Sequence, residues 1–265
     1  MKTFRLNCFG LTGFVCWAAV LLFSLPMAAQ SATKPRVLVY TRNYTPDGKG
    51  YVHDNIAASV TAIRKMGMES GFDVDASDDP AVFTTENLQK YAALVFSNSN
   101  NEAFSTDAQR DAFRKFIQAG GGFVGIHSAS GSERAWPYFW QVLGGKFVKH
   151  PRMQTFTVRV TDTSFAAMKG VPKEFTWTDE CYFLDHLNPD IHTVLATDRT
   201  KLTDLDAMHI DISAFQKELP LAWYQHFDGG REFYIALGHN KEDYENPMFY
   251  GILKNGILWA IGPKN

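Results

Sequence analysis

A helix and the buried strand that follows it are encoded by residues 106–128, TDAQRDAFRKFIQAGGGFVGIHS. The first part has the apolar spacing of a helix, with Ala112, Phe113, Phe116 and Ile117 on one face. Three glycines then end the helix, and the apolar run Phe-Val-Gly-Ile is typical of a strand buried on both faces. The strand delivers His127 and Ser128 at its carboxyl end, where a site can form.

The chain before residue 106 shows the same alternation of helices and strands. We predict strands at 36–41, 72–75 and 92–97, and a helix that ends near Met68. Each helix carries the chain back, so that the next strand runs in the same direction as the last. We therefore expect an α/β fold with a doubly wound, mostly parallel sheet.

From Phe147 onward the pattern changes to extended runs. We predict strands at 154–161, 176–184 and 194–197, then a late β-hairpin with arms at 221–227 and 232–237, and a closing helix at 249–261. No boundary signal separates the two halves. We therefore interpret residues 36–262 as one domain with an elaborated second half.

The amino terminus has the layout of a secretory signal peptide, which we assign to residues 1–30. Two basic residues precede an apolar stretch at 14–25, and small residues follow at 28–29. The stretch is short for a membrane span, although an uncleaved membrane anchor stays open as an alternative. We expect a secreted or periplasmic protein that does not contact the membrane after removal of the signal.

Charge, glycine placement and cysteine content argue against several classes of function and site. Basic residues number 26 and acidic residues 28, so no positive stripe is available for nucleic acid. Gly120–Gly122 precede a strand, whereas a phosphate-binding loop follows one, so we expect no nucleotide cofactor. Cys181 is the one cysteine outside the signal segment, which excludes an internal disulfide.

Four motifs occur in an order that resembles the trehalose-utilisation (ThuA-like) family. They are GGGFVGIHS at 120–128, DECY at 179–182, PLAW at 220–223 and GREFYIALGH at 230–239. The resemblance covers nearly the whole mature chain. It implies the class I glutamine amidotransferase-like, flavodoxin-related fold.

The same resemblance argues against glutamine hydrolysis. Amidotransferases place a cysteine nucleophile after the strand that here ends in His127, and Cys181 lies in a different segment. An imidazole cannot form the thioester that this chemistry requires. His239 resembles the amidotransferase catalytic histidine, which implies a retained pocket with different chemistry.

His127 and His239 directly follow apolar strands, and ligands of open parallel sheets bind at that edge. We expect both side chains to face a solvent-filled pocket. His53 lies near the same edge, and the resemblance implies that Glu180 faces the pocket. Imidazoles with a carboxylate suit Zn²⁺, Mn²⁺ or Fe²⁺, or serve as general acid and base without metal. We predict His127, His239 and Glu180 as catalytic residues, and these three with His53 as a metal set.

Substrate contacts are predicted at Tyr182, Trp140 and Asp179, because aromatic faces beside a polar pocket suit sugar rings. Asp179 is open to two further interpretations, a carboxylate that supports the site and an exposed strand residue. His150 is equally open, as a site residue or a turn histidine. Ser128 lacks the G-x-S-x-G elbow of serine hydrolases.

These expectations, together with the resemblance, predict an exported enzyme that acts on a small sugar or glycoside, including a keto-sugar. Hydrolysis, isomerisation and elimination all suit a pocket of histidines and a carboxylate. The alternative is a non-catalytic sugar-binding module of the same fold. Product formation would separate the two hypotheses.

Overall fold

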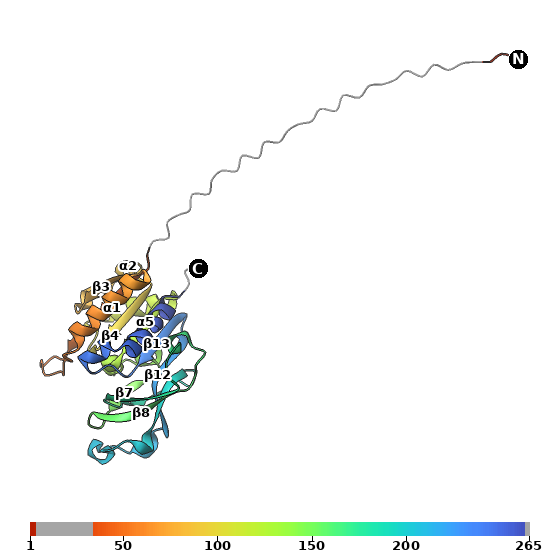
Figure 1. The fold of residues 1–265 in the computed structure, drawn as a ribbon. Helices are drawn as coiled ribbons and strands as arrows, with labels where there is room; N and C mark the ends of the chain where they lie inside the picture. The colour runs from red at the N-terminus through yellow and green to blue at the C-terminus, as the bar shows by residue number, and fades with distance from the viewer. Residues whose placement is uncertain (4–33, 263–265) are drawn as a thin grey trace. The chain divides into compact units, whose positions relative to one another are not determined.

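Five parallel strands form the first half of a nine-stranded sheet (Figure 1). In spatial order they are β3 (Asp73–Ser77), β1 (Arg36–Tyr40), β4 (Ala93–Ser97), β6 (Gly122–Ile126) and β13 (Gly230–Ile235). Strands β4 and β6 are buried along their whole length, as expected for strands covered on both faces. The computed structural model describes residues 1–3 and 34–262, so most of the predicted signal peptide lies outside the described residues.

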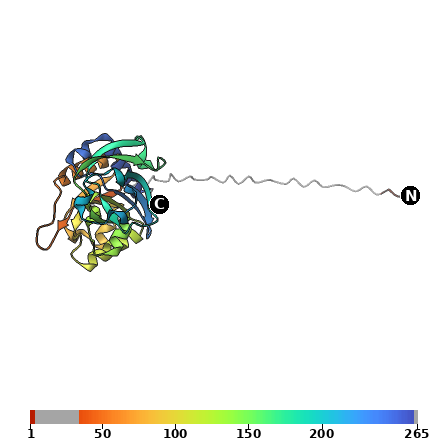
Figure 2. The ribbon, with the colours of Figure 1, turned by 90° about the horizontal axis from the view of Figure 1, so that it is seen from below.

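Helices cover both faces of these strands (Figure 2). On one face α1 (Ile56–Ser70) and α5 (Pro247–Ile261) pack on Val39, Val124 and Ile235. The other face carries α3 (Asp107–Gln118) and α4 (Pro137–Leu143), with the short α2 (Thr85–Leu88) beside α3. Thr106 caps α3 by accepting a hydrogen bond from Gln109 N, which fixes where this helix begins.

Beyond β13 the sheet becomes antiparallel, so the whole sheet is mixed. The added strands are β12 (Glu218–Phe227), β11 (His192–Asp198), β8 (Gln154–Val160) and β9 (Glu174–Asp179). Asp228 and Gly229 form the predicted hairpin turn, with φ of 47° and 97°. Two small sheets pair β7 (Lys146–Lys149) with β10 (Phe183–Asp185), and β2 (Asn43–Tyr44) with β5 (Asn100–Asn101).

The predicted single strand at 176–184 is wrong. The chain leaves the large sheet after Asp179 and joins β7 from Phe183, so that Glu180, Cys181 and Tyr182 lie between two sheets. Asp179 fixes this break, because its side chain accepts hydrogen bonds from the distant backbone N–H groups of Gly238 and His239. The break places Glu180 and Tyr182 beside the ends of β6 and β13.

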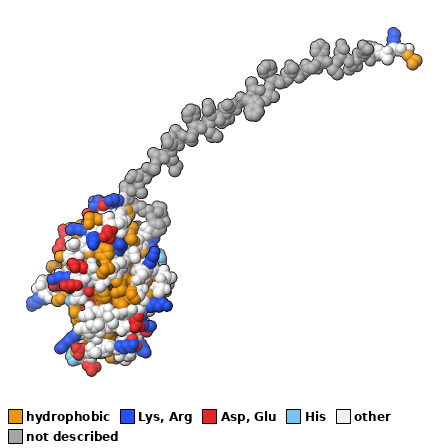
Figure 3. Space-filling model, viewed as in Figure 1, with side chains coloured by type: hydrophobic (Ala, Val, Ile, Leu, Met, Phe, Trp, Pro, Cys, Tyr) orange, Lys and Arg blue, Asp and Glu red, His pale blue; other side chains and the backbone are white. Residues whose placement is uncertain are grey.

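Charges of both signs are mixed over the face shown in Figure 3, in keeping with the net charge of −2. Within 34–262 no helix is long and apolar enough to cross a membrane.

Candidate functional site

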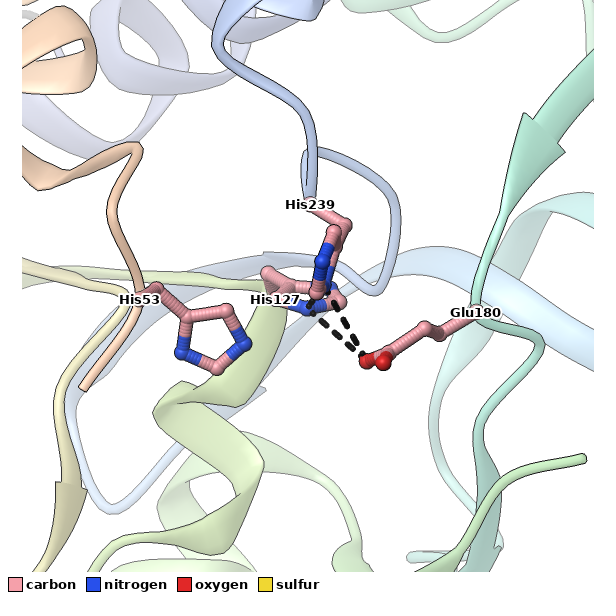
Figure 4. Close-up of side chains that lie close together, drawn as sticks. All are labelled: His53, His127, Glu180 and His239. Carbon is pink, nitrogen blue, oxygen red and sulfur yellow. Dashed lines mark hydrogen bonds and ion pairs between the residues drawn. The ribbon is translucent and has the colours of Figure 1, made fainter. Parts of the chain in front are cut away.

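Four side chains from separate segments meet at the carboxyl ends of the parallel strands (Figure 4). His53 precedes α1, His127 follows β6, Glu180 follows β9 and His239 lies shortly after β13. His127 has a φ of 51°, a left-handed conformation that is strained for a residue with a side chain. The structure therefore brings together the four residues predicted as a metal set.

The potential ligand atoms lie close together. Each residue offers one nitrogen or carboxylate oxygen, and these four atoms all lie within 4.8 Å of one another. His239 Nδ1 lies 3.2 Å from both His127 Nε2 and Glu180 Oε2. Three imidazole nitrogens with one carboxylate oxygen are consistent with a metal site.

Hydrogen bonds orient two of the imidazole rings. His127 Nδ1–H donates to the Ala236 carbonyl at 2.7 Å, which leaves the Nε2 lone pair directed at the cluster. The Tyr182 hydroxyl donates to that Nε2 at 2.8 Å. Ser128 Oγ lies 3.2 Å from His53 Nδ1. Partners of this kind hold metal-binding histidines in a fixed orientation.

His127 is fully buried, contrary to the expected solvent-facing position. The Tyr182 ring stacks on it at 4.5 Å, and His53 packs against it edge-on at 4.8 Å. By contrast, 16% of the His239 side chain is exposed. Only one of the two strand-end histidines therefore faces solvent to any extent.

The protonation states in the cluster differ from residue to residue. Burial, reinforced by His127, lowers the pKa of His53 to about 3, so this ring is uncharged at neutral pH. Burial favours a higher pKa for Glu180, but the His127 and His239 rings outweigh it and hold this pKa below its usual range. The hydrogen bond to Glu180 raises the pKa of His239. Burial raises the pKa of Tyr182, which keeps the phenol protonated.

A buried polar network holds the backbone of His239. Asp179 accepts from Gly238 N at 2.8 Å and from His239 N at 3.4 Å. Asn55 Nδ2 lies 2.7 Å from the Gly238 carbonyl and 2.8 Å from the His239 carbonyl, and donates to them. The Tyr244 hydroxyl donates to the Gly238 carbonyl as well. Asp179 thus supports the site from within the core.

The cluster opens into a cavity of about 630 Å³, which we call the carboxyl-end pocket. Tyr182 lines it, whereas Asp179 is fully buried and does not. Trp140 does not line this pocket, because α4 directs it toward His186 and Lys146. The lining comprises Thr45, Asp47, Lys49, Gly50, Tyr51, His53, Asn100, Asn101, Ser128, Gly131, Arg134, Phe147, His150, Glu180, Tyr182 and His239.

Sequence reasoning missed Asn55 and Arg134 and left His150 undecided. His150 lines the pocket, with Nε2 at 3.6 Å from Glu180 Oε1. Its Nδ1–H donates to the Pro151 carbonyl, the position expected of a turn histidine. A single polar residue in a loop carries no spacing signal, so only the fold could reveal Asn55 and Arg134.

The family model for trehalose utilisation, ThuA, matches residues 36–260. The chain belongs to the ThuA family. None of the curated proteins compared with this ThuA chain matches it. The family is linked to trehalose utilisation by its description, and the match spans all four residues of the cluster.

Solved structures with the same fold include two ThuA-like proteins. That of Bacteroides uniformis ATCC 8492 is 22% identical with a TM-score of 0.68, and the alignment covers 89% of this chain and 95% of that one. That of Parabacteroides merdae ATCC 43184 is 17% identical with a TM-score of 0.64, covering 86% and 91%.

The carbohydrate deacetylase Agd3 shares the fold at 12% identity and a TM-score of 0.51, over 84% of this ThuA chain and 32% of the deacetylase. The fold is therefore also found in carbohydrate-processing proteins.

Proposed function

We propose that this chain is an exported carbohydrate-processing enzyme that acts on a small sugar or glycoside, including a keto-sugar, with a divalent metal at its site. The observation that carries this proposal is the convergence of His53, His127, Glu180 and His239 to within 4.8 Å. Membership of the ThuA family supports a sugar as the substrate.

The donor set fits Zn²⁺, Mn²⁺ or Fe²⁺, since neutral imidazoles and a carboxylate are ligands that all three accept. When bound, such an ion supplies a Lewis acid for a carbonyl or hydroxyl oxygen. The hydrogen bond from His127 Nδ1 to Ala236 keeps Nε2 available as a ligand. The network of Asp179 and Asn55 holds His239 in place.

The chain also offers proton-transfer groups at the mouth of the cluster. His150 Nε2 faces the second carboxylate oxygen of Glu180 and lies at a partly exposed position. The Tyr182 hydroxyl would lose its hydrogen bond to His127 Nε2 when that nitrogen binds an ion, and this phenol, protonated because burial raises its pKa, would then be free to donate to a substrate oxygen. These roles suit hydrolysis, isomerisation or elimination.

Metal analysis and turnover of the purified mature protein test the proposal. We expect one divalent ion per chain by mass spectrometry, and product from a panel of oxidised and unoxidised disaccharides. A matched Glu180→Gln variant removes the ligand charge with little change in volume, and should lose both properties. Sugar binding without product would instead support a non-catalytic binding module. Retention of metal and activity by Glu180→Gln would contradict the assigned site.

Export is tested separately. The basic and apolar pattern of residues 1–30 predicts cleavage, so the exported protein should begin between Ala29 and Pro35 by intact mass. A protein that keeps Met1 and stays in the membrane fraction would contradict this part of the proposal.

A further inference from the structure

Arg134 lies in the wall of the carboxyl-end pocket, and its solvent-exposed side chain contacts Asn100 and Phe147. One nitrogen, Nη2, donates to Asn100 Oδ1 at 3.1 Å. The guanidinium carbon lies 5.5 Å from the centre of the Phe147 ring. Gly131 leaves room on a third side, since a Cβ there would lie 2.8 Å from Nη2.

The backbone next to Arg134 is anchored independently. The preceding residue, Glu133, accepts from Phe104 N at 3.0 Å and from Arg110 Nε at 2.8 Å. Its own N–H donates to the Asn101 carbonyl at 2.7 Å. Glu133 is thereby committed to Arg110, and the Arg134 side chain is positioned without using the neighbouring carboxylate.

This guanidinium has donors but no acidic partner. Within residues 34–262 no carboxylate oxygen lies within 4.0 Å of it, whereas Arg110 pairs with both Glu133 and Asp107. A guanidinium offers five N–H donors in a planar fork. The lining also holds Lys49, Asp47 and Glu180. Arg134 therefore contributes a guanidinium whose donors are not taken up by a carboxylate of the described residues.

The position of Arg134 relates it to the cluster. Phe147 packs against Tyr182 at 4.6 Å between ring centres, and Tyr182 donates to His127 Nε2. Two aromatic rings thus separate Arg134 from the histidines. A sugar lying along these rings would present one end to the cluster and the other to the guanidinium.

We propose that Arg134 binds an anionic group of the substrate, a carboxylate or a phosphate, so that the pocket selects acidic sugars over neutral ones. The inference rests on the proposed function, because it names the substrate class of the same site. A planar guanidinium recognises both kinds of anion through paired hydrogen bonds.

Isothermal titration of D-glucuronate, glucose 6-phosphate and D-glucose into the purified protein, with its metal content measured in parallel, tests this inference. We expect at least one of the two acids to bind about tenfold more tightly than glucose, a difference of ~1.4 kcal/mol. The preferred acid identifies the anion as carboxylate or phosphate. Arg134→Gln should abolish the preference while leaving the metal content and the affinity for glucose unchanged.

Arg114→Gln is the matched control. Arg114 also lies over aromatic rings, Trp136 and Tyr138, but does not line the carboxyl-end pocket. This variant should keep the wild-type preference.

Equal affinities for acids and glucose, or no binding of either acid, would overturn the proposal. A preference that survives in Arg134→Gln would also overturn it, because another cation of the pocket, Lys49 or the metal, would then bind the anion. A protein that prefers acids through Arg134 but neither holds metal nor forms product would keep this inference and contradict the proposed function.

Discussion

Cavities lie at both ends of the parallel strands, and their chemistry differs. The carboxyl-end pocket, of about 630 Å³, adjoins the cluster of three histidines and Glu180, whose ligand atoms lie within 4.8 Å of one another. The amino-end cavity, of about 500 Å³, is bordered by Ala92, Gly121 and Gly229, which directly precede β4, β6 and β13, respectively. Its described lining residues include no histidine and no carboxylate.

Left-handed backbone occurs at both ends of the strands, but in different settings. Beyond the carboxyl ends of β4 and β6, Asn98 and His127 have φ of 52° and 51° although neither is glycine. At the amino end, Gly120, Asp228 and Gly229 have φ of 88°, 47° and 97°, and these residues follow a helix or form the hairpin turn. The strained His127 belongs to the cluster of histidines with Glu180, whereas the strained Asp228 lies in a two-residue turn. The polar cluster, and not backbone strain alone, therefore distinguishes the carboxyl-end pocket.

The largest expected effect separates the two cavities by chemistry. His127→Ala should reduce the metal content from one ion per chain to nearly none, and lower turnover by at least ~10²-fold. Lys115→Gln, a matched change in the amino-end cavity, should alter neither. Metal analysis and steady-state rates on the sugar converted by the wild type measure both. A wild-type metal content in His127→Ala would contradict the assignment of a metal site to the carboxyl-end pocket.

A second prediction concerns buried polar groups. Both carboxylate oxygens of Asp179 accept hydrogen bonds, whereas Glu232, buried in β13 nearer its amino end, has no hydrogen-bond partner for either carboxyl oxygen among the described residues. Burial raises the pKa of Glu232 well above its usual value, so the folded state favours the protonated form. Stability should therefore fall as the pH rises above ~4.5, the range in which the unfolded carboxyl ionises.

Glu232→Gln removes this ionisation and should flatten the pH dependence, raising the free energy of unfolding at pH 8 by ~1–3 kcal/mol. Urea unfolding at pH 5 and pH 8 provides the measurement. An unchanged difference between the two pH values would show that another group is responsible.

The smallest effect tests the strain itself. His127→Gly and His127→Ala both lose the imidazole, but glycine also relieves the left-handed backbone, so His127→Gly should be more stable by ~1 kcal/mol. At the amino end, Gly120→Ala places a side chain on a left-handed backbone. This variant should lower the free energy of unfolding by a similar amount without loss of metal. Paired urea titrations measure both. Equal stability of the two His127 variants would mean that φ at this position carries no strain.

Local pattern accounts for most of the parallel half. The runs at 123–126 and 233–237 are largely apolar, with Gly122 before the first and Gly238 after the second, so the strands and the positions of His127 and His239 could be predicted from the residues alone. Because both strands are parallel, their carboxyl ends had to share an edge. His53 followed from its place before α1.

Long-range contacts determine the features that the sequence pattern does not predict. Nothing in the sequence at 176–184 interrupts the extended pattern, and the break after Asp179 depends on hydrogen bonds to residues 59 and 60 positions away. The position of Glu180 was accordingly available only through the family resemblance. Trp140 was assigned from its place in an aromatic cluster, but the direction in which α4 points it is set by tertiary packing.

The spacing of the four cluster residues along the chain bears on when an ion would bind during folding. His53, His127, Glu180 and His239 are each separated from the next by more than fifty residues, so an extended chain holds none of them near another. An ion held by all four would close three long loops at once, which is the kind of cross-link that restricts an unfolded chain most. Cys181, the one cysteine beyond the predicted signal, is buried and forms no disulfide within residues 34–262. Such an ion would therefore supply a cross-link that no disulfide provides in that part of the chain. Loading would then be the last step, after the strands have assembled.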